Sequence, residues 1–89
     1  MVEVEFAPSL RRHVDCPPQQ VQAGDLGTVL DAALLVAPRL QHYVFDDQHC
    51  IRKHVAVFIN QRLIIDRSKL SEAVIDGDRV LVIQALSGG

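Results

Sequence analysis

Apolar and acidic side chains alternate along residues 2–6, and this period of two predicts a strand with one buried face. Residues 79–84 are rich in β-branched side chains, which predicts a final strand close to the end of the sequence. Residues 51–60 carry apolar side chains on both faces in their second half, which is typical of a central strand. Residues 62–65 are expected to return as a short strand after a turn at Asn60-Gln61, since asparagine tolerates left-handed backbone geometry.

One helix is predicted over residues 29–37, where apolar side chains recur at helical spacing. Thr28 is placed to cap its N-terminus, and Pro38 disfavours helical geometry at the residue before it, so the helix should stop or kink there. Residues 40–45 are expected to wrap under the sheet. Two strands compete in the segment before the helix. A strand over residues 10–16 would meet Pro17-Pro18, so the alternative over residues 20–23 is favoured.

This order of elements predicts a two-layer α+β domain, in which an open mixed sheet carries one main helix packed on one face. A long connection between parallel neighbours would bring the last strand beside the first. The domain is expected to span residues 1–84, with residues 85–89 as a flexible C-terminal tail. A chain of 89 residues with 48% hydrophobic composition can form one core but has no room for a deep catalytic cleft. We therefore expect a protein that is not itself an enzyme.

Charge and hydropathy disfavour several classes of partner. The formal net charge is −2 and no dense basic run is present, so nucleic-acid binding is not expected. The acidic, alternating N-terminus lacks the layout of a secretory signal. No apolar run approaches the about 20 residues that span a membrane. These features predict a cytoplasmic protein without a membrane partner.

The terminal Gly88-Gly89 pair offers chemistry in the backbone itself. Residues without a Cβ can pass through a channel too narrow for other side chains. The α-carboxylate of Gly89 is ionised at neutral pH and can attack a phosphoryl group. Joined to AMP, it would gain a good leaving group and become open to attack by a sulfide or an amine. The alternative interpretation is a frayed end, since termini are often composed of small residues.

Other candidate side chains do not form a recognisable site in the sequence. Cys16 and Cys50 are too few for a four-thiolate [2Fe-2S] cluster and are expected to remain unpaired. His49, Cys50 and His54 lack the paired spacing of a zinc site and are interpreted as solvated loop residues. We therefore predict neither a metal site nor a catalytic constellation.

Several features occur together in the order and at the spacing of a known family. They are the segment Val57-Phe58-Ile59-Asn60, the turn Asp76-Gly77-Asp78, the run Val80-Leu81-Val82-Ile83 and the terminal Gly88-Gly89. In these features the chain resembles the ubiquitin-like sulfur-carrier family of the ThiS and MoaD type, over essentially its whole length except residues 10–23. The resemblance implies a β-grasp fold. The tail residues 84–87 differ from the Pro-rich or Val-Ala approach of many molybdopterin-type carriers, which argues against that pathway.

The resemblance also implies a reaction cycle that is run by partners. A ubiquitin-activating-like enzyme would use Mg-ATP to adenylylate the Gly89 carboxylate, and a sulfur donor would convert it to a thiocarboxylate for a sulfur-accepting biosynthetic enzyme. The carrier would hold no permanent cofactor, and its partner would recognise the tail through Leu86, Ser87 and Gly88. The sequence ends at Gly89, so no clipping is expected. The alternatives are a protein modifier conjugated to lysines through Gly89 and a non-covalent interaction module.

Strand parity predicts the surface that the activating enzyme would contact. If the helix covers the face bearing Val80 and Val82, then Leu81 and Ile83 point to the opposite face, near Phe58. An exposed apolar patch there would mark an interface. With reversed parity, these side chains would belong to the core instead.

Overall fold

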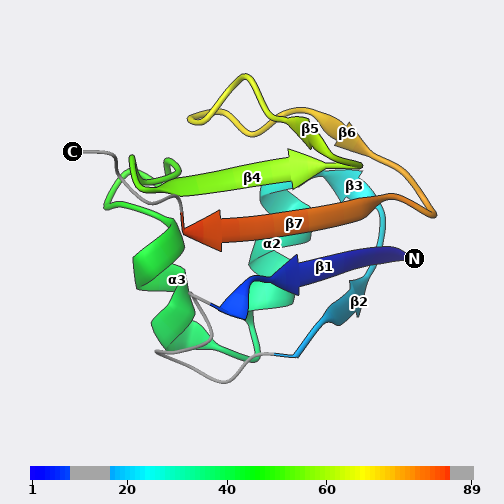
Figure 1. Ribbon diagram of the computed structural model, residues 1–89, viewed down its shortest axis with the longest axis horizontal. Helices are drawn as coiled ribbons and strands as arrows, with labels where there is room; N and C mark the ends of the chain where they lie inside the picture. The colour runs from blue at the N-terminus through cyan, green and yellow to red at the C-terminus, as the bar shows by residue number, and fades with distance from the viewer. Residues whose placement is uncertain (9–16, 85–89) are drawn as a thin grey trace.

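The protein folds around a five-stranded mixed sheet, in a computed structural model that describes residues 1–8 and 17–84 (Figure 1). The strand order is β2-β1-β7-β4-β5. The strands are β1 (Val2–Phe6), β2 (Gln19–Val21), β4 (Val55–Ile59), β5 (Arg62–Leu63) and β7 (Arg79–Gln84). The first and last strands run parallel, with Val4 opposite Val80, so the predicted long connection between them is confirmed.

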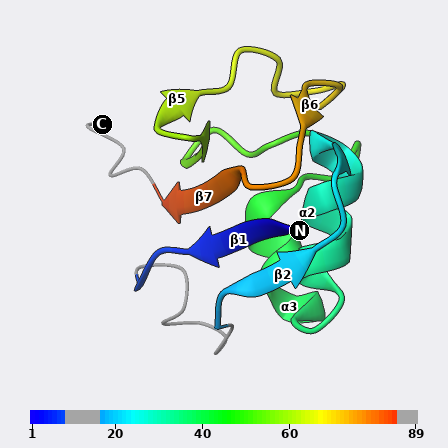
Figure 2. The ribbon, with the colours of Figure 1, turned by 90° about the vertical axis from the view of Figure 1, so that its right-hand side faces the viewer.

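Two helices cover one face of this sheet, α2 (Leu26–Leu34) and α3 (Pro38–Val44). Figure 2 shows both of them on the same side of the strands, and no other helix of residues 1–8 and 17–84 covers the opposite face. The α+β class and the mixed sheet are therefore as predicted. The predicted main helix is α2, which begins and ends three residues earlier than the predicted range 29–37, and α3 is a second helix that was not predicted.

The position of α2 follows from its cap. Asp25 is the N-cap, and its carboxylate accepts a hydrogen bond from the backbone N–H of Thr28 at 2.8 Å. The assignment of Thr28 as the cap was wrong, because the aspartate three residues earlier already accepts this N–H. At the other end, Pro38 begins α3, where a proline lacks only an N–H that the first turn leaves unpaired anyway.

Two strand predictions need adjustment and one ladder was not predicted. The favoured early strand is present as β2, at Gln19–Val21, while residues 51–54 lie outside β4. The short strand after the turn is limited to β5. A second, two-stranded sheet pairs β3 (Gly24–Asp25) with β6 (Ala73–Val74), and this is the ladder that was not predicted.

The core lies between the helices and the inner face of the sheet. Every second residue of β1 and β4 is buried, as is each of Val80 and Val82 on β7. From α2, the buried side chains are Leu26, Val29, Leu30, Ala33 and Leu34. This arrangement fixes which residues of each strand face outward, and those residues form the candidate site.

Candidate functional site

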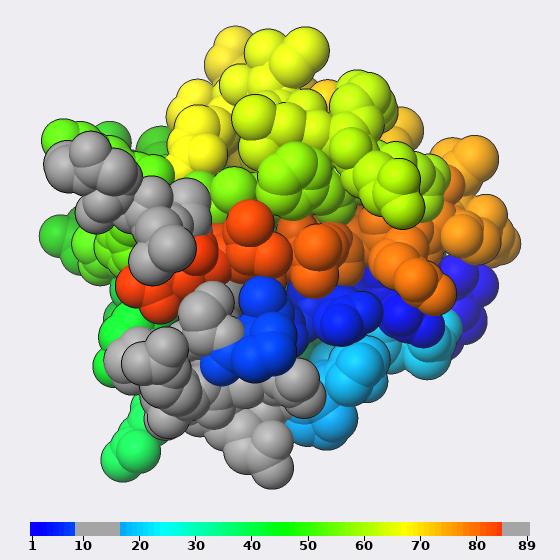
Figure 3. All heavy atoms as spheres, viewed as in Figure 1, coloured from blue at the N-terminus to red at the C-terminus, as the bar shows by residue number. Residues whose placement is uncertain are grey.

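A row of side chains crosses the open face of the sheet on four neighbouring strands. Leu81 of β7 lies opposite Phe58 of β4 on one side and opposite Glu5 of β1 on the other. Phe58 is in turn paired with Leu63 of β5. Residues directly opposite one another in a sheet point to the same face, so these four side chains lie together. Figure 3 shows this face, where atoms of β7 are visible between those of β4 and β1.

Buried and half-buried side chains alternate along β7, as strand parity predicts. Val80 and Val82 are buried against the core, and Leu81 and Ile83 are half-buried on the open face. Phe58 is also half-buried, and Leu63 is 52% exposed. Ile83 lies opposite Ala56, so the apolar patch continues to the end of β7 at Gln84. We call Phe58, Leu63, Leu81 and Ile83 the apolar patch.

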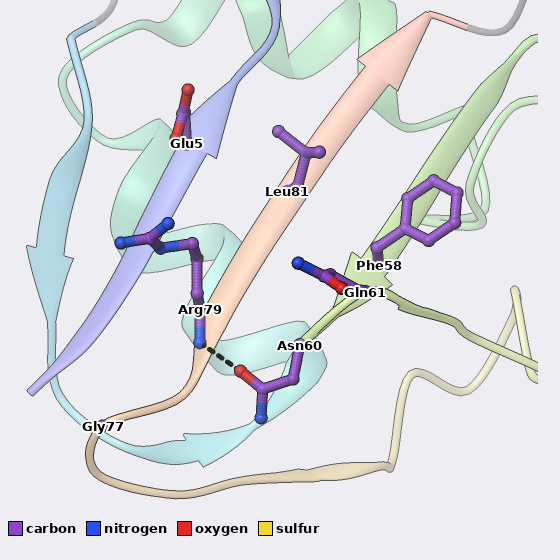
Figure 4. Close-up of a pocket in the computed structure, with 7 residues that line it drawn as sticks. All are labelled: Glu5, Phe58, Asn60, Gln61, Gly77, Arg79 and Leu81. Atoms are coloured by element: carbon purple, nitrogen blue, oxygen red, sulfur yellow. Dashed lines mark hydrogen bonds between the residues drawn. The ribbon is translucent and has the colours of Figure 1, made fainter.

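A hollow adjoins this patch at the start of β7 (Figure 4). Phe58 and Leu81 contribute its apolar side, and the remaining wall is polar. In Figure 4 the side chains come from β1, β4, β7 and the turns that connect the strands. The lining residues are Glu5, Phe58, Asn60, Gln61, Gly77, Arg79 and Leu81.

Hydrogen bonds from Asn60 hold the polar end of the hollow. Its side chain accepts from the backbone N–H of Arg79 at 2.9 Å and donates to the Asp78 carboxylate at 2.8 Å. Asn60 and Gln61 both have positive φ, 50° and 70°, which confirms the predicted turn. The other carboxylate oxygen of Asp78 accepts from the N–H of Ile75 at 2.9 Å, and these hydrogen bonds lower the pKa of Asp78. These hydrogen bonds connect the turn at Asn60-Gln61 to the turn at Asp76-Gly77-Asp78.

The charged residues of the open face differ in their partners. Arg79 Nε lies 3.3 Å from the Glu3 carboxylate, whose other oxygen accepts from Gln20 at 3.3 Å. Glu5 is half-buried, and within residues 1–8 and 17–84 it forms neither a hydrogen bond nor an ion pair. Sequence reasoning missed Glu5 and Arg79, although both alternate with the buried positions that it identified.

The predicted tail residues Leu86, Ser87, Gly88 and Gly89 lie outside the described residues, as does Cys16. The structure therefore places only the point from which the tail starts. This point is the end of β7, where Gln84 lies opposite Val55 at the beginning of β4. The apolar patch reaches the same end of the sheet through Ile83.

Among the described residues, His49, His54 and Cys50 form no common site. His49 Nε2 lies 2.7 Å from the Asp31 carboxylate, and its ring stacks on Phe45 with centroids 4.1 Å apart. Cys50 is a free thiol, and His54 is half-buried. Across the described ranges, no three side chains of metal-ligating type are grouped to hold an ion. His49 instead links the loop at residues 46–50 to α2.

The comparisons with known proteins agree with this architecture. The model of the ThiS family matches residues 11–89. Similar solved structures include SAMP1 from Haloferax volcanii, with 24% identity, a TM-score of 0.79, and coverage of 99% of this chain and 98% of that one. CysO from Mycobacterium tuberculosis has 20% identity and a TM-score of 0.79, covering 97% and 100%. The BexX/CysO complex of Amycolatopsis orientalis matches at 18% identity and a TM-score of 0.73, with 100% of both chains covered.

These likenesses confirm the ubiquitin-like β-grasp fold. No curated protein matches the chain. Among the residues that the structure describes, no helix is both long enough and apolar enough to cross a membrane.

Proposed function

Because this chain belongs to the ThiS family, we propose that it is a small sulfur carrier whose Gly89 carboxylate is activated and converted to a thiocarboxylate by partner enzymes. In the first step, a carboxylate oxygen attacks the α-phosphorus of Mg-ATP bound to a ubiquitin-activating-like enzyme, and pyrophosphate leaves. In the second step, a sulfide attacks the carbonyl carbon of Gly89, and AMP leaves with the former carboxylate oxygen. The thiocarboxylate then donates its sulfur to a biosynthetic enzyme.

The observation that carries this proposal is the apolar patch and its position at the end of β7, after which residues 85–89 follow in the sequence. Leu81, Ile83 and Phe58 lie on the face of the sheet opposite α2 and α3, and the patch ends beside Gln84, the last residue of β7. Contiguous apolar surface that is at least partly exposed marks protein interfaces. Residues 85–89 can extend at most about 17 Å. An enzyme seated on the patch could therefore receive Gly89 in an active site within that distance.

The carrier contributes positioning in this cycle, and its partners contribute the catalytic groups. The four aspartates whose pKa is lowered all accept hydrogen bonds from nearby backbone N–H groups, which assigns them to caps and turns. The complex of CysO with BexX in Amycolatopsis orientalis supports the idea that carriers of this fold act through a bound protein. No permanently bound cofactor is proposed, since Mg-ATP would be supplied on the partner.

The test is the intact mass of the purified protein before and after incubation with the ubiquitin-activating-like enzymes of its organism, Mg-ATP and a sulfur donor. We expect a mass increase equal to the exchange of one oxygen for sulfur, together with release of AMP. A variant lacking Gly88 and Gly89 is the matched control and should not change in mass.

Two other results would support a different function. Conjugates joined by an amide bond between Gly89 and a lysine would identify a protein modifier. An unchanged mass without AMP release, using enzymes shown to activate another carrier, would contradict both covalent functions and favour a binding module.

A further inference from the structure

The charges that border the hollow do not balance. Arg79 and Glu3 form an ion pair at 3.3 Å, so one positive and one negative charge offset each other. Asp78 is occupied by hydrogen bonds from Asn60 and Ile75. The carboxylate of Glu5 remains as the charge in the hollow's lining without a partner among the described residues.

The position of Glu5 exposes its unpaired carboxylate to desolvation when a partner binds. Glu5 lies opposite Leu81 in the β1–β7 ladder, so its carboxylate stands at the border between the apolar patch and the polar end of the hollow. Figure 4 shows the side chains of Glu5 and Arg79 on the same face as Leu81. An apolar surface seated on Leu81 and Phe58 would remove water from this carboxylate. Desolvating an unpaired charge is costly unless the partner supplies an opposite charge.

We propose that the protein partner that docks on the apolar patch also places a lysine or arginine side chain in the hollow, where it pairs with Glu5. A partner carboxylate would be repelled there, because the charged side chains of β1 and β7, which are Glu3, Glu5 and Arg79, have a net charge of −1. Glu5 would thus select for a partner surface that combines an apolar contact with a cation. This inference rests on the proposed function, since the partner it describes is the activating enzyme.

The experiment uses the activating enzyme that converts the wild-type protein in the mass assay. AMP release is measured as a function of carrier concentration for wild type, Glu5→Gln, Glu5→Lys and the control Asp47→Asn, an exposed acid that does not line the hollow. For Glu5→Gln we expect about a tenfold higher half-saturating concentration with little change in the maximal rate. Glu5→Lys should raise the half-saturating concentration further, and Asp47→Asn should leave it unchanged.

Salt dependence separates an ion pair from a packing effect. Added salt should weaken the wild type more than Glu5→Gln, because it screens only an interaction between charges. A thermal melt of each variant verifies that the fold is retained. Scanning the lysines and arginines on the enzyme's docking surface should reveal one whose replacement by glutamate is rescued by Glu5→Arg.

The inference is overturned if Glu5→Gln matches the wild type in half-saturating concentration and in salt response while the wild type is efficiently activated. That outcome leaves the proposed function intact. Failure of the wild type to be activated at all would instead remove the proposed function, and the inference with it.

Discussion

Four aspartates share one role at the level of single residues. Each accepts a hydrogen bond from the backbone N–H of a residue two to four positions away, and the bond favours the ionised carboxylate and lowers its pKa. The residues are Asp25, Asp46, Asp66 and Asp78. The sequence alone does not distinguish these four aspartates from the other aspartates of the chain. The backbone geometry around them makes the difference.

The lowered pKa of these aspartates predicts that the protein loses stability in acid. Because the pKa of Asp78 in the folded protein lies below its ordinary value of 3.8, its contribution is fully present above that value and disappears as the pH falls through the folded pKa. The free energy of unfolding, measured by denaturant titration from neutral pH down to about pH 2, should fall most steeply below the ordinary value. Asp78→Asn should be less stable at neutral pH and show a shallower decline. An acid slope equal to that of the wild type would contradict this role.

Secondary-structure elements differ in how far local sequence specifies them. The alternation in β1 and β7 is local, so both strands were predicted with their inward and outward faces. Helix α3 was missed because it has seven residues, begins with Pro38 and buries only Leu40 and Val44. A helix this short is marginal by itself and depends on packing against neighbouring elements. The β3–β6 ladder has two residues in each strand, too few for a periodic signal.

Helix α2 allows a matched test of which leucines stabilise the fold. Leu30 is fully buried, whereas Leu35, its C-cap residue, is 79% exposed. Leu30→Ala should reduce the free energy of unfolding by about 2 to 5 kcal/mol, since it removes buried methyl groups and leaves a cavity. Leu35→Ala should change it by less than about 0.5 kcal/mol. Chemical denaturation followed by circular dichroism measures both values. Equal effects of the two substitutions would show that the helix packs through a different face.

In the folded molecule as a whole, one face of β7 is buried in the core and the other is available to a partner. We expect the double variant Leu81→Asp/Ile83→Asp to abolish activation of Gly89 while it still unfolds cooperatively, because both side chains are only half-buried. Val80→Asp is the control on the same strand, and it should unfold the protein because it buries an unpaired charge. Activation is measured by intact mass and folding by denaturation. Loss of cooperative unfolding in the double variant would show that the open face stabilises the core.

The candidate site was only partly accessible to sequence reasoning. Parity along β7 indicated Leu81 and Ile83, and the central strand indicated Phe58. Leu63 and Glu5 join them only through the register of three strand pairs, β4 with β5, β4 with β7 and β1 with β7. Residues far apart in the chain share a face only after the ladders have formed. No local pattern could therefore have assembled this group.

By itself, the sequence determined the features that depend on neighbouring residues. Periodicity specified the main strands and one amphipathic helix, and the turn residues at Asn60 and Gly77 specified sharp reversals that the structure contains. The terminal diglycine and the spacing of the last strand indicated the family. Tertiary structure alone decided that residues 38–44 form a helix and which charges of the open face are paired. These features arise from contacts between distant segments, whose free energy no short stretch of sequence contains.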